Sequence, residues 1–228
     1  MYKLHFVNGR SLIIDLHLNG KTVIIVGAGN EALKRIKLLQ NEGCKIIVIG
    51  EKPNSDIITL SKTKKIVLKK NKITSSLFLK THKPFLVIAS TNDSLLNQKI
   101  VQTAKKNKIL AYASDSPDSS DISYLSLIDI KKTIKIAIST NGGSPIMAKK
   151  IKLKTEKCIQ KNISDEDVEL IKIQKFARNE SKKYILTQIE RKKFLYELMN
   201  DKRVKELLKD GKYKAIQTTI KKMVKDWK

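Results

Sequence analysis

Hydrophobic and polar positions follow two alternating patterns through the first half of the chain. Short apolar runs predict five strands, at residues 22–26, 45–49, 65–68, 85–89 and 109–113. Between them lie stretches with apolar residues three or four positions apart, as in an amphipathic helix; Leu33, Ile36 and Leu39 are an example. The run at 85–89 is apolar throughout, which is typical of a parallel strand covered on both faces. The alternation predicts an α/β fold with a Rossmann-like doubly wound parallel sheet.

The pattern changes after Pro117. Residues 122–128 and 133–139 read as two strands joined by the short segment 129–132, which predicts a β-hairpin and not a crossover. A helix is expected to begin near Ile146, and the remainder carries helical periodicity only. Near the amino terminus, residues 2–7 and 11–16 also have strand character. We therefore predict three regions, namely 1–113, 114–148 and 149–228.

A glycine turn joins the first core strand to the first helix. Gly27, Gly29 and Ala32 form a G-x-G-x-x-A pattern, in which the first glycine makes the tight turn and the second lets a pyrophosphate approach the backbone. The first N–H groups of the helix, at Asn30 and Glu31, have no partner within it and suit a phosphate. The pattern predicts a dinucleotide site; an ordinary strand-to-helix turn is the alternative.

The second strand ends just before an acid. Glu51 lies about 20 residues beyond the glycine turn, where a carboxylate accepts hydrogen bonds from the ribose hydroxyls of NAD. Its charge disfavours the 2′-phosphate of NADP, so NAD is the predicted cofactor. We include its neighbour Lys52 among the predicted cofactor contacts. The alternative is that Glu51 is a solvated loop residue.

Small polar residues follow the fourth strand. Ser90 and Thr91 lie at its carboxyl end, which is the edge where open α/β sheets bind ligands. Together with Asn92 and Asp93, they also suit an N-cap for the next helix. We predict cofactor contact for Ser90 and Thr91, and capping alone would explain the same residues.

The chain carries a net charge of +25, almost all of it from lysine. The lysines are spread along the whole sequence, whereas nucleic-acid binders concentrate arginines or aromatic residues in one element. The charge fits either a solvated basic surface or a polyanionic ligand that it helps to capture.

No apolar run approaches the roughly 18 residues of a membrane span. We also expect no signal peptide and, because Cys44 and Cys158 lack metal-ligand spacing, no metal site. These features predict a cytoplasmic protein that binds neither membrane nor nucleic acid.

Five segments match a known family in order and in spacing. They read GAGNEALKRIKLL at 27–39, ASTNDSLLN at 89–97, SDSP at 114–117, STNGGSP at 139–145 and ERKKF at 190–194. In these segments the chain resembles the siroheme synthase family, which comprises precorrin-2 dehydrogenases and sirohydrochlorin ferrochelatases. The resemblance extends from about residue 12 to residue 223.

The resemblance implies NAD-dependent dehydrogenation of precorrin-2 to sirohydrochlorin in siroheme and tetrapyrrole biosynthesis. It implies that Asp115 is the catalytic base and that the hairpin region 114–148 forms a homodimer next to the active site. Residues 1–113 would then be the NAD-binding domain and 149–228 a helical domain. From the residues alone, Asp115 before Ser116 and Pro117 also suits a turn.

The second glycine loop is the candidate site for the substrate's eight carboxylates. The residues expected to take part are Thr140, Gly142, Ser144 and Lys149. Lysine suits carboxylates as a point charge. Ser144 is also expected to cap the helix that follows.

Three departures from the family pattern lie on the tetrapyrrole side. Tyr112 stands where the family usually has an asparagine, and Asn141 replaces a family glycine. Ile122 and Leu125 stand where the hairpin strand of the family usually carries Phe and Pro. They leave open whether the enzyme also inserts Fe²⁺ or is a dehydrogenase only. Two more distant alternatives are an NAD(H)-sensing regulator that binds nucleic acid and a regulatory domain of an ion transporter.

Overall fold

The computed structural model describes residues 11–227. These residues form two compact units, of which one is Leu12–Tyr124 and the other begins at Leu125. The boundary between the two units lies at Tyr124, and the three-region division expected from the sequence stays a prediction.

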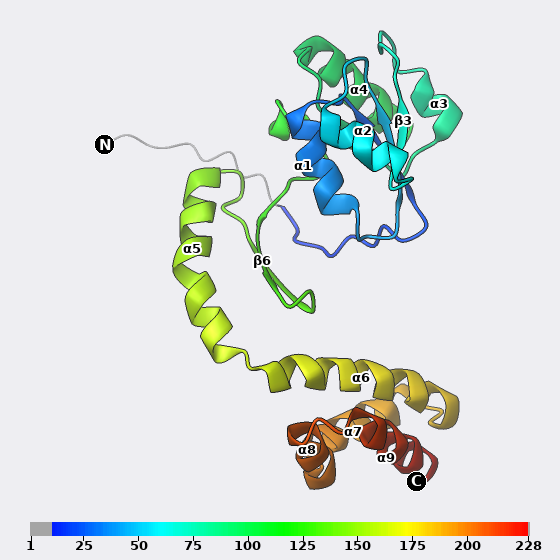
Figure 1. Cartoon of the computed structure of the whole chain (residues 1–228), viewed down its shortest axis with the longest axis vertical. Helices are drawn as coiled ribbons and strands as arrows, with labels where there is room; N and C mark the ends of the chain where they lie inside the picture. The colour runs from blue at the N-terminus through cyan, green and yellow to red at the C-terminus, as the bar shows by residue number, and fades with distance from the viewer. Residues whose placement is uncertain (1–10, 228) are drawn as a thin grey trace. The chain divides into compact units, whose positions relative to one another are not determined.

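The first unit is built on a five-stranded parallel sheet (Figure 1). The strand order is β3-β2-β1-β4-β5, so the direction of winding reverses between β1 and β4. The strands are β1 (Thr22–Val26), β2 (Lys45–Ile49), β3 (Val67–Lys69), β4 (Leu86–Ala89) and β5 (Leu110–Ala113). The helices are α1 (Asn30–Leu39), α2 (Ser55–Lys62), α3 (Phe78–His82) and α4 (Ser94–Lys106), with the 3-10 turn η1 (Pro117–Ser119) after β5. This confirms the predicted Rossmann-like sheet.

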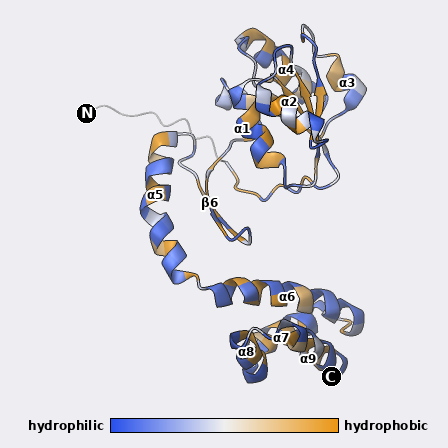
Figure 2. Ribbon diagram, in the orientation of Figure 1, coloured by the Kyte–Doolittle hydropathy of each residue, from blue (hydrophilic) through white to orange (hydrophobic). Residues whose placement is uncertain are grey.

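Two hydrophobic layers hold this sheet, one on each face. Ile25, Ile36 and Ile57 lie in one layer, and Ile24, Val87 and Ile100 lie in the other, all fully buried. The central strands are buried on both faces, which explains their continuous apolar sequence. Figure 2 shows hydrophobic colouring on the helices and strands of this unit, alternating with hydrophilic colouring on the helices.

The second unit begins with the predicted hairpin. Strands β6 (Ser126–Ile130) and β7 (Ile134–Ile138) pair antiparallel. The turn lies at Lys131 and Lys132, which adopt left-handed conformations, and the Lys132 N–H donates a 2.9 Å hydrogen bond to Asp129 Oδ1. Helices follow to the end of the described chain. They are α5 (Pro145–Asn162), α6 (Asp165–Tyr184), α7 (Gln188–Asn200), α8 (Lys202–Lys209) and α9 (Tyr213–Lys225).

Helices α6 to α9 pack around a core of their own. Phe194 is fully buried and meets the ring of Trp227 edge-on, with 5.3 Å between centroids. Glu190 Oε2 accepts a hydrogen bond from Trp227 Nε1, and Arg191 Nη1 donates to the carbonyls of Ile185 and Leu186 at the end of α6. The ERKKF segment at 190–194 therefore stabilises the helical bundle.

The strand predicted at 11–16 is wrong. The segment has no regular secondary structure, and Leu12 is 85% exposed. A strand needs a partner, and the described sheet offers these residues none. The strand predicted at 2–7 lies outside the described residues. The hairpin strands also start later than predicted, at Ser126 and Ile134, and the third strand starts at Val67.

Candidate functional site

The turn after β1 is possible only because residue 27 is glycine. Gly27 has φ +110°, and a Cβ built on it would lie 2.4 Å from the Ser90 carbonyl oxygen. Gly27 N–H donates to the Ile49 carbonyl, and Ser90 N–H donates to the Val26 carbonyl. The ends of β1, β2 and β4 are thus joined at the point where the winding reverses, which is where doubly wound sheets bind ligands.

Gly29 is open on its side-chain face, in contrast to Gly27. A Cβ built on Gly29 would meet nothing within 4 Å, so no protein contact requires a glycine here. The first hydrogen bond of α1 runs from Leu33 N–H to the Gly29 carbonyl, and the N–H groups of Asn30 and Glu31 precede it. An exposed backbone with available N–H groups at a helix N-terminus fits the pyrophosphate of a dinucleotide.

The end of β2 packs closely against the glycine turn. A Cβ on Gly50 would lie 2.7 Å from the Ala28 Cβ, so Gly50 lets the two loops meet. Glu51 and Lys52 are exposed beside this contact. Asn54 connects the loops, because its N–H donates to the Ala28 carbonyl and its Nδ2 donates to Asn30 Oδ1.

The loop after β4 is held by a buried amide. Asn97 is fully buried on α4, and its Oδ1 accepts hydrogen bonds from the Thr91 N–H and from Thr91 Oγ1, the latter at 2.7 Å. Its Nδ2 donates to the Thr91 carbonyl. Asp93 caps α4 through the Leu96 N–H, which confirms the capping prediction. Ser90 donates its hydroxyl to the Val26 carbonyl, so Ser90 and Thr91 are both held at the carboxyl end of β4.

Asp115 emerges at the end of β5 beside the first turn of α4. Ser94 Oγ donates a 2.7 Å hydrogen bond to Asp115 Oδ2. Partial burial acts to raise the pKa of Asp115, but hydrogen bonds from Ser94, Asn97 and its own backbone outweigh this effect and hold the pKa below its ordinary value. The Asp115 residue as a whole is exposed, and its carboxylate, ionised at neutral pH, can accept a proton from a bound substrate.

Glu31 is engaged within its own helix. Its carboxylate accepts from Arg35 Nη2 at 2.6 Å and from Lys34 Nζ at 3.0 Å. The hydrogen bond from Lys34 lowers the pKa of Glu31, and the charges of Arg35 and Lys34 add to this, against a smaller opposing effect of burial. Only the backbone N–H of Glu31 suits a phosphate, since its side chain carries a negative charge.

Tyr112 lies under the same arginine. The Arg35 guanidinium stacks on Tyr112 and on Tyr124, at 4.9 Å and 4.2 Å from the ring centroids, and Nη2 donates to the Tyr112 hydroxyl. Burial raises the pKa of Tyr124 to about 12, so this ring stays neutral under the guanidinium. Tyr112, which replaces the family asparagine, is thus part of the packing between β5 and α1.

The second glycine loop belongs to the other unit, so the site residues divide between the two. Thr140 Oγ1 accepts from the Ser144 N–H, and Ser144 caps α5 by accepting from the Met147 N–H, as expected. Asn141 has φ +49°, a conformation that asparagine tolerates better than most residues, which explains how it can stand in for a glycine. Gly142 has φ +77°, and Lys149 is exposed on α5.

Three residues that organise the site were not predicted as site residues. Asn97, Asn54 and Gly50 hold the loops through contacts between segments far apart in sequence. Asn97 is part of the ASTNDSLLN segment at 89–97. A polar residue on the apolar face of the predicted helix was the sequence signal that could have identified it. Within residues 11–227, no cluster of three metal-ligating side chains occurs, and no helix has the length and apolarity to cross a membrane.

Comparisons with known proteins agree with this geometry. Residues 14–126 match a protein-family model described as "Putative NAD(P)-binding". The chain is 30% identical over 213 residues to a siroheme synthase of Buchnera aphidicola and 26% identical over 215 residues to one of Blochmanniella floridana. These matches cover 93% and 94% of this chain but only 43% and 45% of the relatives. The chain thus spans less than half the length of these siroheme synthases.

A solved structure entitled "SirC, precorrin-2 dehydrogenase" has the same fold. It superposes with a TM-score of 0.66 at 21% identity and covers 95% of this chain and all of that one. The match of residues 14–126 to the family model identifies the first unit as an NAD(P)-binding domain. Over nearly its whole length the chain is similar to siroheme synthases, in keeping with the resemblance of its sequence motifs.

Proposed function

We propose that this protein is an NAD-dependent precorrin-2 dehydrogenase that forms sirohydrochlorin in siroheme biosynthesis. The observation that carries the proposal is the position of Asp115, a carboxylate that accepts a hydrogen bond from Ser94 at the carboxyl edge of the sheet. The turns after β1 and β4, where we place the dinucleotide, lie at the same edge of the sheet. A hydride acceptor and a proton acceptor are the two groups that dehydrogenation of a carbon framework requires.

The reaction balances with these two groups. Precorrin-2 loses a hydride and a proton and becomes sirohydrochlorin. NAD⁺, when bound, would supply the hydride acceptor. Asp115 accepts the proton through a carboxylate oxygen and releases it to water.

The chain's own residues would hold the cofactor. Gly29 and the N–H groups of Asn30 and Glu31 would receive the pyrophosphate. Glu51, exposed at the end of β2, would accept hydrogen bonds from the adenosine ribose, and its charge favours NAD over NADP. Ser90 and Thr91 would line the nicotinamide side, and Lys52 would lie at the adenosine end.

The second glycine loop would receive the substrate's carboxylates. Thr140, Gly142 and Ser144 form a polar turn at the start of α5, and the exposed Lys149 follows within its first turns. A phosphate or carboxylate is favoured at such a helix N-terminus.

We also propose that the protein is a cytoplasmic homodimer joined through its hairpin. A two-stranded hairpin is marginally stable alone, and the described residues provide β6 and β7 with no third strand. Both cysteines are free thiols, in keeping with a reducing compartment. Light scattering on the purified chain tests the dimer, and a monomer at micromolar concentration would contradict it.

The direct test of function is anaerobic absorbance spectroscopy with enzymatically made precorrin-2. We expect the sirohydrochlorin spectrum only when NAD⁺ is present. A folded protein that gives no NAD⁺-dependent change would overturn the proposal. Adding Fe²⁺ afterwards examines a second candidate activity, because the carboxylate of Asp115 could equally accept pyrrole N–H protons; a change faster than the protein-free rate would establish it.

A further inference from the structure

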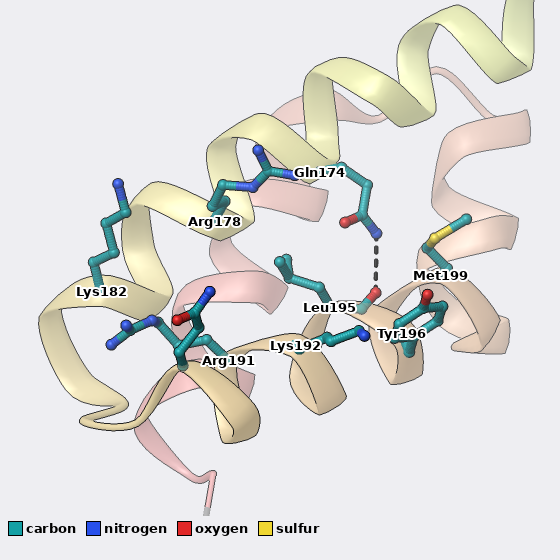
Figure 3. A pocket seen from close by; sticks show the side chains of 9 residues that line it. Gln174, Arg178, Lys182, Arg191, Lys192, Leu195, Tyr196 and Met199 are labelled. Atoms are coloured by element: carbon teal, nitrogen blue, oxygen red, sulfur yellow. Dashed lines mark hydrogen bonds between the residues drawn. The ribbon is translucent and has the colours of Figure 1, made fainter.

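A cleft of about 580 Å³ lies between α6 and α7, within the second unit. Figure 3 shows side chains from both helices bordering it, with a hydrogen bond from Gln174 to the Leu195 carbonyl between them. Its basic residues are Arg178 and Lys182 on α6 and Arg191 and Lys192 on α7. Among the residues that the structure describes, no acidic one lines it. The dehydrogenation chemistry proposed above makes no use of this cleft.

The positive charge of the cleft is largely uncompensated. Arg191 is occupied, since its guanidinium donates to two carbonyls at the end of α6. The side chains of Arg178 and Lys182, by contrast, are exposed and make no hydrogen bond or ion pair with any residue between 11 and 227. A free guanidinium beside a free ammonium group, both within reach of one cavity, is an arrangement that suits carboxylates.

The same cleft presents apolar surface to solvent. Tyr196 is 61% exposed and Met199 is 40% exposed, next to Leu195. The Lys192 Nζ lies 6.0 Å from the centroid of the Tyr196 ring, so its positive charge is next to the aromatic face. An aromatic ring and a methionine favour a ligand with a flat apolar body, since both adapt to such a surface.

We propose that this cleft binds an amphipathic polycarboxylate of the tetrapyrrole class, through carboxylates at Arg178 and Lys182 and the macrocycle edge at Tyr196 and Met199. The ligand class rests on the proposed function. The size of the cleft favours a small molecule, because ligand pockets span roughly 300–1,000 Å³. A nucleic acid would instead need an extended basic stripe along its backbone.

The test is a fluorescence titration of the full chain with uroporphyrin, a stable octacarboxylate tetrapyrrole. The cleft variant is Arg178→Gln/Lys182→Gln. The matched control is Lys221→Gln/Lys222→Gln, which removes the same charge from exposed positions on α9 that do not line the cleft. Circular dichroism verifies that each variant is folded, and the exposed positions of all four side chains make folding the expected result.

We expect the cleft variant to bind uroporphyrin at least about tenfold more weakly, because each charge-assisted hydrogen bond is lost, and the control to change by less than about twofold. Equal weakening in both variants would attribute binding to net charge alone and overturn the proposal. So would an unchanged affinity in the cleft variant. The proposal also fails if the cleft variant loses affinity for a single-stranded oligonucleotide and keeps its affinity for uroporphyrin.

Two results distinguish an error in the proposed cleft site from an error in the proposed dehydrogenase activity. A chain that oxidises precorrin-2 with NAD⁺ but binds uroporphyrin independently of Arg178 and Lys182 is a dehydrogenase without this site. A chain that binds uroporphyrin through the two side chains but never reduces NAD⁺ has the site and lacks the activity.

Discussion

Ser94 Oγ donates a 2.7 Å hydrogen bond to Asp115 Oδ2, which ties the first turn of α4 to the residue that follows β5. The bond connects the two loops at the carboxyl edge of the sheet. It also contributes to the lowered pKa of Asp115, against the opposing effect of partial burial.

The pH dependence of the reaction should move when this bond is removed. Asp115 must be ionised to accept a proton, so the rate falls as the pH drops through its pKa in the folded protein. Ser94→Ala removes a hydrogen-bond donor and raises that pKa, which moves the acidic limb of the kcat/KM profile to higher pH. The comparison is Ser55→Ala, since Ser55 is likewise the first residue of a helix. Superimposable acidic limbs for Ser94→Ala and the unchanged chain would count against the role of this bond.

Gly27→Ala should destabilise the fold. The new Cβ would lie 2.4 Å from the Ser90 carbonyl oxygen, at a φ of +110° that alanine rarely adopts. We expect a loss of about 3 kcal/mol in the free energy of unfolding, from backbone strain and displacement of the β4 loop. Urea denaturation measures it. A loss below about 0.5 kcal/mol, the range of neutral surface changes, would contradict the close approach.

Gly29→Ala should leave the stability of the fold nearly unchanged and weaken the binding of NAD⁺. Nothing lies within 4 Å of the added Cβ, and the backbone at φ −88° and ψ −164° is accessible to alanine. The free energy of unfolding should therefore change by less than about 1 kcal/mol. The affinity for NAD⁺ should fall about tenfold or more, because the methyl group occupies the space of the pyrophosphate. Titration calorimetry measures the affinity for NAD⁺ in the variant and in the unchanged chain. An undiminished affinity in the variant would place the pyrophosphate elsewhere.

Phe194→Ala should loosen the helical bundle and spare the dinucleotide site. Phe194 is fully buried against Trp227, so truncation removes a large core side chain and costs about 3–5 kcal/mol of bundle stability. Trp227 is the chain's only tryptophan, and its fluorescence reports unfolding of this bundle. NAD⁺ affinity is the internal control, because the cofactor residues lie in the other unit. An unchanged fluorescence midpoint in urea would contradict the assigned core.

Local sequence patterns were sufficient for the elements and turns whose determinants lie within one segment. The strand, Gly27 turn and helix at 22–39 are an example, since each depends on near neighbours. The same holds for the capping of α4 by Asp93 and of α5 by Ser144.

Contacts between distant segments were not predictable in this way. Asn97 holds Thr91 only because α4 buries it, and Arg35 stacks on Tyr112 and Tyr124 only because β5 lies next to α1. The strand predicted at 11–16 had suitable residues, but pairing depends on a partner that composition does not reveal.

The most direct test of the central claim is to measure NADH and sirohydrochlorin together during an anaerobic reaction of precorrin-2 with NAD⁺. The unchanged chain and Asp118→Asn, an exposed neighbour in η1, should form one NADH for each sirohydrochlorin. Asp115→Asn should retain NAD⁺ binding and react at least about 100-fold more slowly, because it lacks the proton acceptor. Full turnover by Asp115→Asn would remove Asp115 from the mechanism, and the absence of NADH with the unchanged, folded chain would contradict the dehydrogenase itself.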